Sequence, residues 1–283
     1  MNRIKLSSLL ITLLILVSSC TDDQEFELDE LYYGPKQEIT LSLDYGLAGI
    51  TKASVNETLV EDVNIYVINE LGDLAAYGYY AAASSFDLTV NRDMLYTVYA
   101  IANAGKELHA KDRTELESLV YTITDITDMV SPAGAVLMAG KTPEQTLSDG
   151  QSITIDLTRC ISKVVLQADY SRLNPDVTIN VTSVKMKNVP DIVNVFRDSK
   201  ITSADNAMDG DIVSNPTRQN LINGLVFYAY ENRQGTLLPE NNDQKQKVWP
   251  EGSLNSKICS YIEMEADYSS PRKEGKILYR FYI

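Results

Sequence analysis

The chain has 283 residues, with 39 Asp and Glu against 25 Lys and Arg, and its formal net charge is −14. A chain this acidic offers no broad basic surface, so we expect no nucleic-acid partner and no direct adsorption to anionic lipids. Its length allows two medium domains or one large one, and its 17 tyrosines suit half-exposed β surfaces, where rings pack while hydroxyls reach water.

Residues 1–19 have the pattern of an export signal that ends at a lipidated cysteine. A basic start precedes a short apolar run, and one aliphatic and two small residues come directly before Cys20. The run is too short to cross a bilayer core, which needs about 20 residues. The ending resembles the bacterial lipobox, so we expect Cys20 to carry the acyl chains, palmitate among them, at the mature N-terminus. The alternative is an ordinary secretory peptide with an accidental cysteine.

Residues 20–37 are predicted to form an acidic tether between the lipid and the folded part of the protein. They are rich in Asp and Glu, poor in aliphatic residues, and contain Gly34 and Pro35 near their end. Such a segment buries too little apolar surface to fold by itself. It would hold the folded part away from the membrane.

Residues 38–158 are predicted to form a first β-sandwich domain. Apolar and polar residues alternate there in short runs, which is typical of strands with one buried face. The expected strands cover residues 38–45, 59–69, 76–80, 85–90, 95–102 and 152–157. Thr114 and Glu117 form a capping-box pattern around Leu116, and this pattern predicts one short helix laid on the sheet.

Residues 159–283 are predicted to form a second β-sandwich domain. The expected strands cover residues 159–169, 177–189, 225–230, 257–266 and 276–283, with a long polar loop at 197–220. In the first of these strands the alternation is not strict, which indicates burial on both faces or a bulge. The alternation of residues 177–189 breaks after Val181.

The chain contains no motif that indicates catalysis or metal binding. His109 is the only histidine and has no cysteine or histidine cluster near it, so we expect no metal site and no cofactor. The stretch 205–211 resembles a calcium loop only in part, because Ala207 occupies a ligand position and no glutamate closes the loop. Cys160 and Cys259 both lie in apolar strand patterns, where a free cysteine packs as a small hydrophobe; a disulfide between them is the alternative.

Eight separated stretches resemble the fimbrillin superfamily of the Bacteroidales, the lipoprotein precursors of adhesive fimbriae. They are residues 51–53, 63–73, 96–103, 137–140, 157–164, 184–190, 227–235 and 259–264. Their order and spacing extend over nearly the whole mature chain, behind a lipobox. The turn at 231–235 and the strand that begins at Tyr261 look most like the FimB-type anchor and accessory members.

The resemblance implies an all-β fold with two transthyretin-like antiparallel β-sandwich domains in series. It also implies partners: other fimbrial subunits, joined by strand exchange, and a host or bacterial surface ligand. Polymerising members lose their lipidated N-terminus to a protease that cuts after a basic residue, commonly arginine. No arginine lies between Cys20 and Arg92, and only Lys36 and Lys52 could replace it. We therefore expect the lipidated N-terminus to be retained, as in an anchor or accessory subunit; the alternative is a stalk or tip subunit released at one of these lysines.

Two further features bear on location and assembly. The acidic pair after Cys20 resembles signals that send lipoproteins of this phylum to the outer face of the outer membrane. Family members usually continue beyond the pattern found here at 279–283 with further strands. The resemblance therefore predicts a truncated C-terminal domain or an incomplete last sheet, with an exposed groove that needs a partner strand.

Two other classes of function compete with the fimbrial one. A carbohydrate-binding outer-membrane lipoprotein would combine the same lipobox, tether and sandwiches, but it would favour exposed aromatic platforms, and Trp249 is the only tryptophan. An enzyme would need a pair of acids, and the carboxylates here are scattered. We predict a protein without enzymatic activity.

Overall fold

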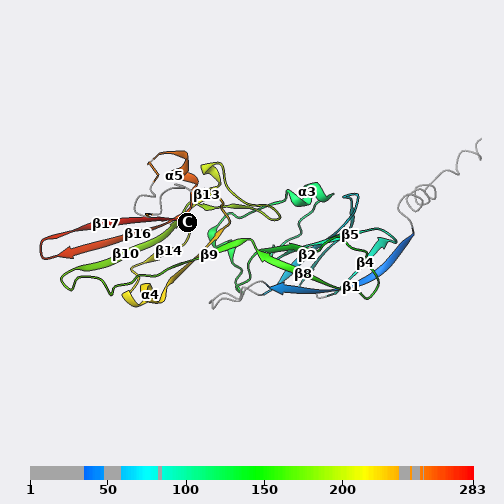
Figure 1. Ribbon diagram of the computed structural model, residues 1–283, viewed down its shortest axis with the longest axis horizontal. Helices are drawn as coiled ribbons and strands as arrows, with labels where there is room; N and C mark the ends of the chain where they lie inside the picture. The colour runs from blue at the N-terminus through cyan, green and yellow to red at the C-terminus, as the bar shows by residue number, and fades with distance from the viewer. Residues whose placement is uncertain (1–34, 48–58, 82–84, 236–242, 244–248, 251) are drawn as a thin grey trace, which may run out of the picture.

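The computed structural model describes residues 35–47, 59–81, 85–235, 243, 249, 250 and 252–283, and Figure 1 shows an elongated molecule built mainly of strands. The export signal, Cys20 and Lys52 lie outside the described residues. Within the described part, none of the helices is long and apolar enough to cross a membrane. The prediction of an all-β fold is confirmed.

The first half of the chain forms one seven-stranded sheet in the order β3-β2-β5-β7-β8-β1-β4. Its strands are β1 (Lys36–Leu47), β2 (Asp62–Asn69), β3 (Leu74–Ala81), β4 (Ser85–Asn91), β5 (Tyr96–Ala102), β7 (Met138–Lys141) and β8 (Ser152–Arg159). All neighbours pair antiparallel except β1 and β8, which are parallel. The expectation of purely antiparallel pairing is therefore wrong at this one pair, because β1 and β8 are distant in sequence and no hairpin dictates their direction.

This sheet closes around a core of its own. Its two end strands meet at Tyr80 of β3 and Phe86 of β4, whose ring centroids are 4.4 Å apart. Alternate residues of the strands point inward, as the period of two requires. The buried residues of this core include Ile39, Leu41, Val63, Ile65, Val67, Val98, Ala100, Ile153 and Ile155.

Strands β2 and β5 are buried on both faces, which their mixed composition does not suggest. All eight residues of β2 and all seven of β5 are buried. The face opposite the first core carries Tyr66 and Ile68 from β2 and Tyr99 and Ile101 from β5 into a second core cluster. These strands are the centre of the sheet, and both sides of them are covered.

The second half of the chain, together with β6 from the first half, forms several smaller antiparallel sheets. A four-stranded sheet has the order β14-β10-β16-β17, and three pairs are β15-β9, β11-β13 and β12-β6. The bounds are β6 (Val120–Thr122), β9 (Ile161–Leu166), β10 (Thr178–Lys187), β11 (Val189–Pro190), β12 (Ile192–Asn194), β13 (Ala207–Met208), β14 (Ile212–Ser214), β15 (Leu225–Tyr230), β16 (Tyr261–Ser270) and β17 (Lys273–Tyr282). Short helices are α3 (Arg113–Glu117), α4 (Arg218–Asn223), α5 (Leu254–Ile258), η1 (Ile126–Met129) and η2 (Ala204–Asn206).

The second core cluster joins residues from both halves of the chain. Val184 of β10, Phe227 of β15 and Ile262 of β16 belong to the same cluster as Tyr99 of β5 and Leu116 of α3. The pairing of β6 with β12 adds backbone hydrogen bonds between residues 120–122 and 192–194. The two halves are therefore joined by packing and by a short sheet as well as by the chain itself.

Several local predictions need correction. The expected strand at 257–266 begins only at Tyr261, because Lys257 ends the short helix α5 together with Ile258. The expected loop at 197–220 contains η2, β13, β14 and the start of α4. The break after Val181 is a bulge, since the register with β16 shifts between Val181 and Ser183.

Candidate functional site

Helix α3 lies over the first sheet, and two of its three charged residues, Arg113 and Glu117, lie one turn apart. The helix begins after Asp112, whose side chain accepts a hydrogen bond from the backbone N–H of Glu115 at 2.8 Å. The expected N-cap was Thr114; a carboxylate interacts more strongly with the positive end of the helix and takes this position instead. Leu116 is fully buried, and the spacing of four residues places Arg113 and Glu117 on one side of the helix.

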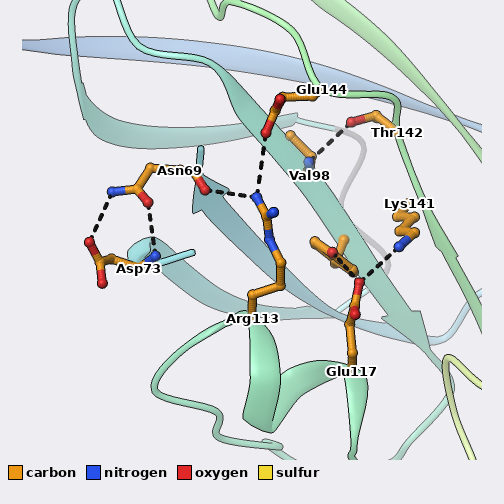
Figure 2. Close-up of polar contacts among 9 residues, drawn as sticks. Asn69, Asp73, Val98, Arg113, Glu117, Lys141, Thr142 and Glu144 are labelled. Carbon is orange, nitrogen blue, oxygen red and sulfur yellow. Dashed lines mark hydrogen bonds and ion pairs between the residues drawn. The ribbon is translucent and has the colours of Figure 1, made fainter. Parts of the chain in front are cut away.

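Arg113 joins the helix to the turn between β2 and β3 (Figure 2). Its Nη2 donates to the backbone oxygen of Asn69 at 2.9 Å and lies 3.5 Å from Oε1 of Glu144. The Asn69 side chain in turn accepts from the backbone N–H of Asp73 at 2.8 Å. Gly72 occupies this turn at φ +95°, a backbone conformation in which a residue with a side chain would be strained. The hydrogen bond from Arg113 therefore fixes helix α3 against the turn between β2 and β3.

Glu117 joins the helix to β5 and β7, as Figure 2 also shows. Its Oε1 accepts hydrogen bonds from the Tyr99 hydroxyl at 2.8 Å and from Nζ of Lys141 at 2.9 Å. Nζ of Lys141 also lies 5.2 Å from the centre of the Tyr99 ring. Beside them, Oγ1 of Thr142 accepts the backbone N–H of Val98 at 3.1 Å.

The electrostatics of this cluster favour a fixed ion pair over proton transfer. The hydrogen bonds from Lys141 and Tyr99 lower the pKa of Glu117, so this carboxylate is ionised at neutral pH. Burial, together with the bond to Glu117, raises the pKa of Tyr99, so its hydroxyl stays protonated. Because neither group changes its charge near neutral pH, the cluster serves to position the helix.

The other residues that the sequence singled out are dispersed. His109 is exposed, 3.4 Å from Oε2 of Glu107, and its ring lies edge-on to Tyr77. In the stretch 205–211, Asp209 is paired with two lysines, Lys185 and Lys187, each at 2.5 Å. Among the described residues, no group of three or more His, Cys, Asp or Glu side chains is placed to hold a metal ion.

Cys160 and Cys259 are both buried and unpaired. Burial raises the pKa of Cys160 to about 12 and raises that of Cys259 as well. Both therefore carry protonated thiols and pack as small apolar residues. Trp249 packs in a small core with Ile201 and Ile258, so it is no exposed platform for a sugar ring.

Lys36, one of the two predicted cleavage positions, is the first residue of β1 and lies opposite Asn91 of β4. β1 lies between β4 and β8 in the sheet, and it pairs with β4 over Lys36–Ser42 and with β8 over Ser42–Leu47. Leu41 of this strand is completely buried in the first core. Cys20 and Lys52, the other residues singled out, stay predictions.

The sheet of the second half ends in a long edge. β17 pairs with β16 over ten residues, and no described strand lies along its other edge. Leu278 and Tyr279 in this strand are 50% and 40% exposed. A long edge strand of this kind is a site for adding another strand.

The fold also creates a groove that no sequence pattern predicts, and we call it the cationic groove because four of its lining residues are basic. The cationic groove has a volume of about 350 Å³ and is lined by residues 139–141, 158–162, 193–198, Glu231 and Arg233. It lies where β7 and the β8–β9 connection face the segment after β12. Sequence reasoning missed it because its charged residues come from four distant segments.

The fold of the chain is similar to that of several solved structures. No family model matches it, and no curated protein matches it. A fimbrilin of Porphyromonas gingivalis W83 superposes with a TM-score of 0.54 at 10% identity, over 87% of this chain and 80% of that one.

Two other solved structures are described as putative cell adhesion proteins. One, from Parabacteroides distasonis ATCC 8503, has a TM-score of 0.58 and 11% identity, over 88% of this chain and 84% of that one. The other, from Bacteroides eggerthii DSM 20697, has a TM-score of 0.56 and 14% identity, over 88% of this chain and 80% of that one. These likenesses confirm, at the level of fold, the resemblance seen in the sequence: the chain has the fold of the Bacteroidales fimbrillins.

Proposed function

We propose that this protein is a non-enzymatic surface lipoprotein that anchors or decorates a fimbria and joins its neighbouring subunits by β-strand exchange. Acylated Cys20 would hold it in the outer membrane, and residues 20–37, of which the last two already belong to β1, would form the tether to two domains, 38–158 and 159–283. The likeness in fold to a fimbrilin and to two putative cell adhesion proteins supports a role in fimbriae or adhesion.

The observation that carries the proposal is a gradient of exposure across the four-stranded sheet. Val184, Met264 and Tyr279 lie in register on neighbouring strands β10, β16 and β17, and so share one face of the sheet. Val184 is completely buried, Met264 is half-buried, and Tyr279 is 40% exposed. The core-facing side of the sheet is therefore covered at β10 and progressively uncovered toward the edge strand.

The next row of the same face repeats this gradient. Met186 and Ile262 are buried, whereas Phe281 on β17 is only half-buried, and its ring stacks on that of Tyr279 at 6.2 Å. A strand added along β17 would pair with its backbone and cover these rings with one set of alternate side chains. That combination of backbone bonds and side-chain burial is the physical basis of strand addition.

The position of β1 supports retention of the N-terminal segment. A cut after Lys36 would fall at the first residue of β1, whereas a cut after Lys52 would separate the whole strand from the rest of the chain. The first core would then hold Ile39 and Leu41 only by non-covalent contacts. An uncut chain keeps this core intact, as a permanent anchor requires.

The intact mass and N-terminal peptide of the protein from its own outer membrane test the anchor role. We expect an acylated Cys20 on an otherwise uncut chain, and we expect Cys20→Ser to release the protein from the membrane. A mature N-terminus after Lys36 or Lys52, without lipid, would replace the anchor role by that of a polymerising stalk or tip subunit.

A matched pair of variants in β17 tests strand exchange. Tyr279→Ser removes an apolar ring from the uncovered core face, whereas Leu278→Ser changes a comparably exposed neighbour on the opposite face. We expect only Tyr279→Ser to reduce the amount of protein that copurifies with fimbriae. Equal losses for both variants, or no loss for either, would contradict the assignment of this edge.

A further inference from the structure

The cationic groove concentrates positive charge in a strongly acidic chain. Four of its lining residues are basic, namely Lys141, Arg159, Arg197 and Arg233, and two are acidic, Asp198 and Glu231. The chain as a whole has a net charge of −14. The groove is thus a local exception to the charge of the molecule, and such an exception attracts anions to one place.

The loop that presents Arg197 is held at both ends. At its start, the backbone N–H of Val195 donates to the carbonyl of Leu119 at 3.1 Å. At its end, Ser199 accepts the backbone N–H of Asn194 on its hydroxyl at 3.1 Å and the backbone N–H of Arg233 on its carbonyl at 2.8 Å. Arg197 is therefore exposed on a fixed loop, which lowers the entropic cost of binding a ligand there.

The two acidic residues of the groove share one cation within it. Arg233 lies 2.5 Å from Oε1 of Glu231 through its Nε, and 2.9 Å from Oδ1 of Asp198 through its Nη1. The two carboxylates are thereby paired with a cation and repel an incoming anion less. Arg233 itself remains well exposed. Lys141 on the opposite wall is also exposed, but its Nζ is paired with Oε1 of Glu117 at 2.9 Å.

The rest of the lining offers groups that suit a sugar. Thr158, Ser162 and Asn194 supply hydroxyl and amide groups, which can bond to sugar hydroxyls. Phe196 adds an aromatic ring, held edge-on against Tyr99 with centroids 5.2 Å apart. The volume of about 350 Å³ lies in the range of small-molecule sites. We infer that the cationic groove binds a carboxylate-bearing sugar chain, with Arg197 on a carboxylate and the neutral groups on its hydroxyls.

Three short probes of equal length separate this inference from its competitors. Calorimetry on the full-length protein would use trigalacturonate, neutral maltotriose and a capped triglutamate peptide. We expect measurable binding of trigalacturonate, weakened by added salt, and much weaker binding of the other two. Maltotriose binding equally well would overturn the role of charge, and triglutamate binding equally well would overturn the choice of a sugar. No binding of trigalacturonate would overturn the site.

A variant pair locates the binding. Arg197→Gln removes one exposed guanidinium that can bind a carboxylate through two hydrogen bonds, so we expect trigalacturonate affinity to fall about tenfold. Arg272→Gln is the matched control, because Arg272 is exposed in the turn between β16 and β17, outside the groove. Circular dichroism would verify that both variants keep the fold. Equal losses of affinity would place the binding outside the groove.

Discussion

The hydroxyl of Tyr99 donates a hydrogen bond of 2.8 Å to Oε1 of Glu117, and this contact connects the central strand β5 to helix α3. Tyr99 is buried, and Glu117 is partly exposed at the surface. The pair therefore links the second core to a charged surface cluster. Its contribution to stability can be measured through the titration of Glu117.

Glu117→Gln should lower the free energy of unfolding by about 1 kcal/mol at neutral pH, because a charge-assisted contact with Tyr99 and Lys141 is lost. The pKa of Glu117 is lowered in the folded state from an ordinary value of 4.5. Its stabilisation is therefore present above about pH 4.5 and lost as the pH falls through the lower, folded-state pKa. Urea unfolding from pH 7 to pH 3 should show a smaller decline for Glu117→Gln than for the unmodified protein. Parallel curves would refute this role.

Phe227→Ala should destabilise the protein by about 3 to 5 kcal/mol, because its completely buried ring fills the core shared by the two halves. Val226→Ala is the control: the neighbouring side chain is 41% exposed and should cost well under 1 kcal/mol. The loss of stability of each variant is measured from the midpoint of its unfolding in urea. Similar values for the two variants would contradict the burial of Phe227.

Asn103→Gly should destabilise the protein through lost side-chain hydrogen bonds. Asn103 has φ +63°, which glycine adopts freely, so the backbone is kept. Its side chain accepts from the N–H of Glu61 and donates to the carbonyls of Leu59 and Val136, each at 2.8 Å. We expect a loss of about 2 kcal/mol in the free energy of unfolding.

Asn215→Gly is the matched control for Asn103→Gly. Asn215 has φ +47° and is exposed. Its replacement should change the free energy of unfolding by less than about 0.5 kcal/mol. Equal effects at the two positions would mean that the backbone conformation, and not the side-chain contacts, decides the outcome.

Cys160 and Cys259 should resist alkylation in the folded protein, because both thiols are buried and the pKa of Cys160 is raised to about 12. A thiol reagent at pH 7 should label neither cysteine until denaturant is added, and then both. The measurement is the mass of peptides around residues 160 and 259. A mass lower by two hydrogens, restored by a reductant, would instead reveal a disulfide.

Much of the first sheet could be predicted from local pattern. Alternation places Ile39 and Leu41 on one face of β1, and both are buried there. Alternation could not predict that Asn64 of β2 is buried as well. Its side chain donates to the carbonyl of Lys106 and accepts from the backbone N–H of Leu108, in a loop some 40 residues away in the chain, and it also accepts from the Tyr77 hydroxyl of β3.

The candidate sites depend even more on distant contacts. The sequence predicts a capping box of Thr114 and Glu117. In the structure Glu117 accepts hydrogen bonds from Tyr99 and Lys141, and Asp112 caps the helix. The cationic groove brings Lys141, Arg197 and Arg233 together from separate strands and loops. No spacing in the chain encodes that proximity.

The sequence by itself determined the all-β class, because the period-two alternation and turn residues act within a few residues of each other. It also predicts a lipidated Cys20, which lies outside the described part, and a tether over residues 20–37, most of which lies outside it as well. Only the tertiary structure decided the parallel pairing of β1 with β8, the shared core, the uncovered edge of β17 and the cationic groove. The physical reason is that these features arise between segments far apart in the chain, where packing and backbone pairing across the whole fold select the partners.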